Sequence, residues 1–169
     1  KTGSIKGIVF NYDEESGSYM ILDYRYLKEE YRLYVRYYDG KKWADTQGYN
    51  VILTENAWYD FNIHVVNGEK TTTVVVEYKT GDADYIAVSR TFKVAVPGRN
   101  VGYYSTAANG LQFGEITTGK TTYIGAEDER YAVKGGSFLR TDKGVTVGEG
   151  HSTMLDKKID LAKKNSYKL

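Results

Sequence analysis

A segment rich in Tyr and Arg, YRLYVRYYDGKKW (31–43), carries the residue types of this chain that are best suited to binding a ligand. Polar and apolar residues alternate along it, so Tyr34, Arg36 and Tyr38 are expected on one face of a strand. Aromatic rings stack on the apolar faces of sugar rings, while a guanidinium donates hydrogen bonds to hydroxyls. The sequence therefore predicts a carbohydrate site, with these candidate residues: Tyr24, Tyr26, Tyr34, Arg36, Tyr38 and Trp43.

Two of these candidates, Tyr24 and Tyr26, precede the segment and are expected on the adjacent strand. A structural role is the alternative for every Tyr in the site. Tyr at alternate strand positions also stabilises a sheet by pairing with side chains on neighbouring strands. The chain holds 17 Tyr, too many for all of them to contact a ligand.

Composition excludes several other classes of function. The 169 residues include 23 basic and 22 acidic side chains, a net charge of +1, so no electrostatic argument favours nucleic acid as a partner. No apolar run approaches the roughly 18 residues of a membrane helix, so we expect no membrane span. Cys is absent, which excludes disulfides, thiolate zinc sites and cysteine catalysis.

Strand patterns recur along nearly the whole chain and predict an all-β sandwich or barrel. Asp39-Gly40 and Asn67-Gly68 are expected to form hairpin turns. One segment, 155–164, has the alternative of a helical turn, because its apolar residues recur at helical spacing.

Three segments resemble concanavalin A-like and laminin-G-like jelly rolls: NVGYYSTAANGLQFGEI (100–116), AWYDFNIHVVNGEKTTTVVVEY (57–78) and IKGIVFNYDEESGSYMILDY (5–24). They look like the closing strand, the Trp-led hairpin and the opening strand pair of that family. The resemblance covers about residues 5–117. It implies a two-sheet antiparallel jelly-roll sandwich that binds a polysaccharide or glycan and lies outside the cell or on its surface.

The order of segments departs from that family. A stretch like 126–169 is expected before the opening strand, so the chain looks circularly permuted. We expect a main body at 1–125 and a C-terminal β segment at 126–169, which completes the same sandwich or a neighbouring one. A natural permutation, a boundary within a tandem array and strand exchange with a neighbour all fit this order, as does a simple additional hairpin.

We expect no catalysis. The E-x-D-x-x-E strand of jelly-roll glycoside hydrolases is absent. Asp60, Glu77 and Glu115 are isolated strand acids, expected to be solvated. His64 and His151 have no carboxylate nearby in the sequence to orient them, and structural roles are expected for both.

Calcium is a possible cofactor, because jelly-roll modules often bind it and two acidic turns could supply oxygen ligands. The family's Asp near the final strand is replaced here, where Gly114-Glu115 stands. The candidate ligands lie in the turns 11–17 and 80–84 and are Asp13, Glu15, Asp82 and Asp84.

A structural subunit of an extracellular filament or surface assembly is the alternative function. An unpaired strand at a sheet edge is a template for another chain, so the tail 156–169 could join copies of the protein by strand exchange. The candidate interface residues in this tail are Ile159, Leu161, Tyr167 and Leu169.

Overall fold

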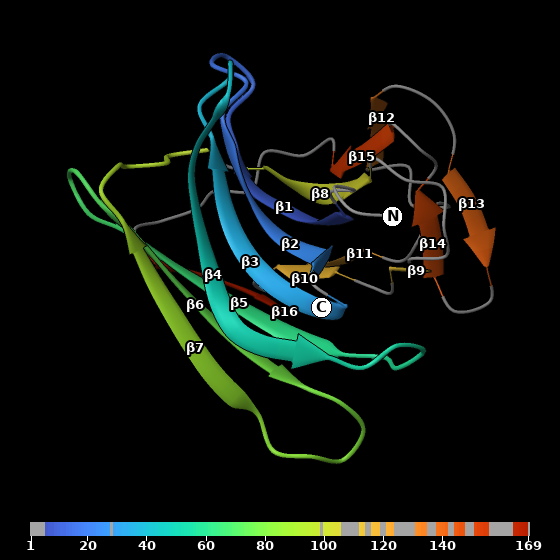
Figure 1. The fold of residues 1–169 in the computed structure, drawn as a ribbon. Helices are drawn as coiled ribbons and strands as arrows, with labels where there is room; N and C mark the ends of the chain where they lie inside the picture. The colour runs from blue at the N-terminus through green and yellow to red at the C-terminus, as the bar shows by residue number, and fades with distance from the viewer. Residues whose placement is uncertain are drawn as a thin grey trace.

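The computed structural model describes residues 6–27, 29–98, 100–105, 112–113, 116–118, 121–123, 131–134, 138–141, 144–147, 151–155 and 164–168. Every regular element in these residues is a β-strand, and every strand pairing is antiparallel (Figure 1). The all-β prediction is confirmed. Among these residues there is no helix with the length and apolar character that crossing a membrane requires.

The larger sheet has seven strands, and its middle is built from the first hairpins of the chain. In Figure 1 its strands β2, β3 and β4 are long, bent ribbons. The strands in spatial order are β12 (Tyr131–Lys134), β15 (His151–Leu155), β8 (Asn100–Ser105), β1 (Lys6–Tyr12), β2 (Tyr19–Leu27), β3 (Glu30–Tyr38) and β4 (Trp43–Leu53).

A six-stranded sheet packs against the larger one, and three short strands form a separate small sheet. The six-stranded order is β11 (Thr121–Tyr123), β10 (Ile116–Thr118), β16 (Lys164–Lys168), β5 (Asp60–Asn67), β6 (Thr72–Lys79) and β7 (Ile86–Phe92). The small sheet contains β13 (Phe138–Thr141), β14 (Gly144–Val147) and β9 (Gln112–Phe113).

Both expected hairpin turns are present. The N–H of Asp39 donates to the carbonyl of Lys42 at 3.1 Å, and Gly40 takes the φ of 91° that favours glycine. The N–H of Gly68 donates to the carbonyl of Thr71 at 2.8 Å. Residues 156–163 lie outside the described residues, so the alternative of a helical turn at 155–164 stays a prediction.

The C-terminal segment contributes to both main sheets of its own chain. β15 pairs with β8, and β16 lies between β5 and β10. In β16, Tyr167 aligns with Ile63 on one side and with Thr118 on the other. The other three candidate interface residues lie outside the described residues: Ile159, Leu161 and Leu169.

The core lies between the two main sheets, a β-sandwich arrangement. Its fully buried side chains come from alternate strand positions, as the two-residue period of a strand requires. Residues of the larger sheet that line the core include Phe10, Leu22, Leu33, Val35 and Val51, and those of the six-stranded sheet include Ile63, Val65, Val74, Val76 and Phe92.

Buried polar contacts tie the 94–96 segment to both sheets. Asn11, at the end of β1, donates through Nδ2 to the carbonyl of Val96 at 2.7 Å. The N–H of Val96 donates to Oγ1 of Thr72 at 3.0 Å, and that hydroxyl donates to the carbonyl of Val94 at 2.9 Å. These buried polar atoms therefore find partners, which avoids the cost of an unmade hydrogen bond.

Side chains also join the two sheets along the edge where β4 and β7 approach. Arg90 of β7 donates through Nη2 to the carbonyl of Gly48 at 2.7 Å, and its guanidinium lies 5.0 Å from the ring centroid of Tyr49. Gln47 donates through Nε2 to the carbonyl of Thr91 at 3.1 Å. The sandwich is closed on this side by side-chain contacts.

A substitution at Gly7 tests the close packing of β1 on β2. An added Cβ would lie 1.9 Å from the carbonyl oxygen of Leu22, so the strands must separate. We expect Gly7→Ala to lower the free energy of unfolding by about 2–3 kcal/mol, measured by urea denaturation. In the control Gly68→Ala, the nearest atom is the rotatable hydroxyl of Thr71 at 2.8 Å, and the cost should stay below about 1 kcal/mol. Equal losses would contradict this packing.

Candidate functional site

The alternation in β3 places its two sets of side chains on opposite faces of the larger sheet. Leu33 and Val35 are buried in the core. Tyr34 is in register with Asp23 of β2, and Arg36 with Ile21. Paired residues of antiparallel strands share a face, so these side chains lie together on the side away from the core. We call this side the outer face. On β2 and β3 it carries the following residues: Tyr19, Ile21, Asp23, Arg25, Glu30, Arg32, Tyr34, Arg36 and Tyr38.

Four of the six predicted carbohydrate-site residues share the outer face: Tyr34, Arg36, Tyr38 and Trp43, the last paired with Tyr38. Tyr24 is not among them. It packs against the core and stacks on Tyr31, with ring centroids 4.9 Å apart and planes 5° from parallel. Tyr26 aligns with Tyr31 in the strand register, and its side chain is outside the described part of the chain.

Aromatic rings gather at one end of the outer face. The ring centroids of Tyr19 and Tyr38 are 5.1 Å apart, and Trp43 meets Tyr38 at 5.3 Å and Tyr19 at 5.8 Å. The edge-on contacts of Trp43 are a favoured aromatic geometry. Tyr19 and Trp43, together with two further tyrosines, pack against the fully buried Val9 and Ile21. This aromatic cluster consists of Tyr12, Tyr19, Tyr38, Trp43 and Tyr104.

Burial keeps two phenols of this cluster, those of Tyr19 and Tyr104, protonated. It raises the pKa of Tyr19 well above the usual value, and the neighbouring phenols of Tyr104 and Tyr38 add to the increase. The pKa of Tyr104 is raised for the same reasons, burial first and Tyr38 second. The hydroxyls of Tyr19 and Tyr104 therefore remain hydrogen-bond donors at any ordinary pH.

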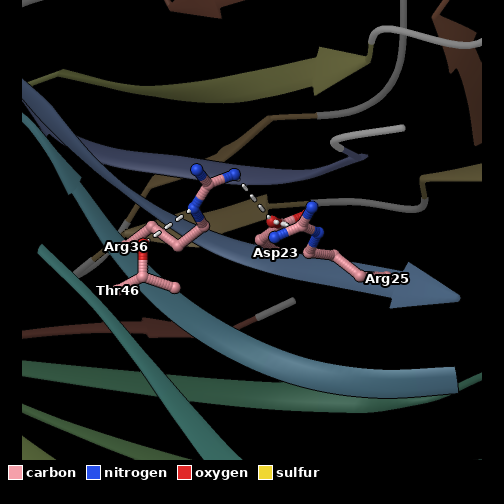
Figure 2. Close-up of polar contacts among 4 residues, drawn as sticks. All are labelled: Asp23, Arg25, Arg36 and Thr46. Carbon is pink, nitrogen blue, oxygen red and sulfur yellow. Dashed lines mark hydrogen bonds and ion pairs between the residues drawn. The ribbon is translucent and has the colours of Figure 1, made fainter. Parts of the chain in front are cut away.

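A buried ion pair, drawn in Figure 2, lies beside the aromatic cluster through the contact of Arg36 with Trp43. Nη1 of Arg36 is 3.3 Å from Oδ2 of Asp23, whose side chain is 0% exposed. Nε of Arg36 donates to Oγ1 of Thr46 at 3.2 Å, and the guanidinium lies 3.7 Å from the ring centroid of Trp43. Burial lowers the pKa of Arg36, and the Asp23 carboxylate opposes that decrease. The geometry holds Arg36 in one orientation between a carboxylate and an indole.

Two further arginines extend the outer face away from the aromatic cluster. Nε of Arg25 is 3.7 Å from Oδ2 of Asp23, and its guanidinium lies 5.9 Å from the ring centroid of Tyr34. Nε of Arg32 donates to Oε2 of Glu30 at 2.9 Å. The exposed fraction of the arginine side chains rises along the face, from 8% at Arg36 to 21% at Arg25 and 35% at Arg32.

The two predicted calcium turns lie apart, at the top and the bottom of the view in Figure 1. The Asp13 carboxylate accepts a hydrogen bond from Oγ of Ser16 at 2.6 Å and so stabilises its own turn. Glu15, Asp82 and Asp84 are exposed. The described residues contain no group of three or more His, Cys, Asp or Glu side chains suited to holding a metal ion. Calcium binding stays a prediction.

Glu77 is 35% exposed, as expected of a solvated strand acid, whereas the expectation that His64 lacks an orienting carboxylate is wrong. Nε2 of His64 lies 3.2 Å from Oε2 of Glu77, and Nδ2 of Asn62 donates to the same oxygen at 3.1 Å. The pairing of β5 with β6 brings these side chains together. Hydrogen bonds from His64 and Asn62 lower the pKa of Glu77. His151 begins β15, and its side chain is outside the described residues.

Several outer-face residues were absent from the sequence-based site. Asp23 and Arg25 have the same two-residue spacing on β2 as Tyr34 and Arg36 on β3, which was a usable signal. Tyr19 follows the same period on β2, whereas Thr46, Tyr12 and Tyr104 could not be found this way, because their proximity depends on the register with β4, β1 and β8. The residues missed are Tyr12, Tyr19, Asp23, Arg25, Thr46 and Tyr104.

Removing the carboxylate of the buried ion pair should lower the free energy of unfolding. Asp23→Asn leaves the Arg36 guanidinium buried without its counter-charge, so we expect a loss of about 3–5 kcal/mol in the free energy of unfolding. Glu30→Gln is the matched control, because its pair with Arg32 is about one-third exposed on both sides and should be worth about 0–1 kcal/mol. Urea unfolding measures both. Similar losses for the two variants would show that the buried pair does not stabilise the sheet.

Comparison of the chain with protein-family models, with curated proteins and with solved structures finds no match.

Proposed function

We propose that this protein is a non-catalytic, extracellular or cell-surface module that binds carbohydrate on the outer face of its larger sheet. The observation that supports the proposal most is the placement of Tyr34, Tyr38 and Trp43 beside Arg36 on one sheet face. Rings and hydrogen-bonding groups at neighbouring positions are what a sugar requires, because it has apolar C–H faces and polar hydroxyl edges.

Tyr34 is the ring best positioned to stack on a sugar. A Cβ added at Gly48 would lie 2.9 Å from Cε1 of Tyr34, so the ring lies directly against the glycine backbone. The carbonyl of Gly48 is held in turn by Arg90. A ring supported from beneath loses little conformational entropy when a ligand stacks on its outer side.

A jelly-roll arrangement of the two sheets is part of the proposal. It is supported by the resemblance of residues 5–117 to concanavalin A-like domains and by the pairing of two antiparallel sheets around one core. The circular permutation is proposed with it, because β12 and β15 lie next to β8 rather than in a separate unit.

Structural assembly by strand exchange is the second candidate. It is favoured by the position of β16, which pairs with β5 over five residues and is the last described strand of the chain. The same strand from a neighbour could pair in the same register, as in domain swapping. The mass of the native species separates the two candidates: open-ended assemblies support exchange, and monomers support the binding module.

Binding should depend on the Tyr34 ring. In affinity electrophoresis through gels containing soluble polysaccharides, we expect at least one polysaccharide to retard the wild-type protein. Tyr34→Ala should weaken that binding about tenfold, and Tyr34→Phe should retain most of it, because the ring does the stacking.

Trp58→Ala is the control, since Trp58 is 46% exposed and precedes β5 in the other sheet. Far-UV circular dichroism checks that each variant is folded. Equal binding by Tyr34→Ala and the wild type, or loss of binding in Trp58→Ala alone, would place the ligand elsewhere.

A further inference from the structure

The outer face carries more positive than negative charge. On β2 and β3 it holds Arg25, Arg32 and Arg36 against the two carboxylates of Asp23 and Glu30, one positive charge in excess. The chain as a whole has a net charge of only +1 in 169 residues, so this concentration of arginine is a local feature.

Two of the arginines occupy directly opposed positions of the β2–β3 hairpin. Arg25 of β2 and Arg32 of β3 are cross-strand partners in the register of the hairpin. Like charges at directly opposed positions destabilise a sheet, so this pair costs free energy in the unliganded protein. A bound anion between the two guanidiniums would remove that repulsion.

Arg25 is the less satisfied member of the pair. The nearest carboxylate, Asp23, lies within hydrogen-bond distance of Arg36, whereas its Oδ2 is 3.7 Å from Nε of Arg25. That Nε is buried and donates to no acceptor in the part of the chain that the structure describes. A ligand cannot reach this buried Nε, so an additional acceptor would pair with the remaining N–H groups of the Arg25 side chain, which is 21% exposed.

The exposed arginines and the Tyr34 ring lie near one another on the outer face. Arg25 and Arg32 are the more exposed arginines, with 21% and 35% of their side chains accessible. The ring of Tyr34 lies 5.9 Å from the Arg25 guanidinium. An acidic group held by the arginines would therefore belong to a molecule whose ring can contact Tyr34.

We propose that the ligand is an acidic polysaccharide, whose carboxylate or sulfate group pairs with Arg25 and Arg32 while a sugar ring stacks on Tyr34. This inference rests on the proposed carbohydrate binding and adds the chemical class of the ligand. Guanidinium matches both anions, because its N–H groups form two parallel hydrogen bonds with a planar or tetrahedral oxyanion.

Matched pairs of probes test the charge requirement by isothermal titration calorimetry: polygalacturonate with its methyl ester, and dextran sulfate with dextran. We expect the wild type to bind at least one acidic member of these pairs, with its neutral counterpart about 10- to 100-fold weaker. Binding should also weaken as salt is raised, because salt screens exposed charges. Preference for polygalacturonate indicates a carboxylate, and preference for dextran sulfate a sulfate.

Variants assign the binding to this face. Arg25→Gln and Arg32→Gln should each weaken acidic binding about tenfold, whereas Arg25→Lys should lose less because it keeps the charge. Lys70→Gln, in the exposed turn before β6, removes one positive charge elsewhere and should change binding less than about twofold. Urea unfolding confirms that the variants are folded.

The outcomes separate the two proposals. Equal binding of acidic and neutral members overturns the requirement for an anion and leaves carbohydrate binding in place. Acid-selective binding that survives Arg25→Gln and Arg32→Gln overturns the assignment to this face. No binding to any of the four probes, with no retardation by neutral polysaccharides, overturns both proposals.

Discussion

The two-residue period of β3 is the constraint on which the rest of the structure depends. Leu33 and Val35 are inserted into the core between the sheets, and this burial fixes the opposite direction for Tyr34 and Arg36. A shift of one residue in register would place the guanidinium in the apolar core and the aliphatic side chains on the outer face. The hydrophobic effect that folds the sandwich therefore also orients the residues proposed to bind the ligand.

Burial has an electrostatic consequence on the neighbouring strand, β2. Asp23 is fully buried, and such a carboxylate is tolerated when a counter-charge and hydrogen bonds compensate for its lost hydration. Arg36 supplies the charge, and Thr46 and Trp43 hold Arg36 in place. The fixed pair lies at the centre of the outer face, and Arg25 beside it is more exposed, with 21% of its side chain accessible.

Much of the fold was predictable from local sequence, whereas the site was predictable only in part. Alternation and turn residues are properties of short segments, so the strands and both hairpin turns were found. The common face of Tyr34, Arg36 and Tyr38 follows from position within one strand. The core position of Tyr24 could also have been predicted from one strand, because Tyr24 alternates with Asp23 and Arg25 of the outer face. The contact of Glu77 with His64, by contrast, needs the pairing of β5 with β6, which single-strand patterns do not specify.

The central claim is that the ligand contacts the outer face of the larger sheet. Amide chemical-shift changes during titration with oligosaccharides of whichever probe polysaccharide binds the protein test it most directly, because they report on every strand in one experiment. The account predicts the largest changes in β2 and β3 around Arg25, Arg32 and Tyr34, with little change in β5, β6 and β7. Changes confined to the six-stranded sheet, or no change at saturating ligand, would contradict it.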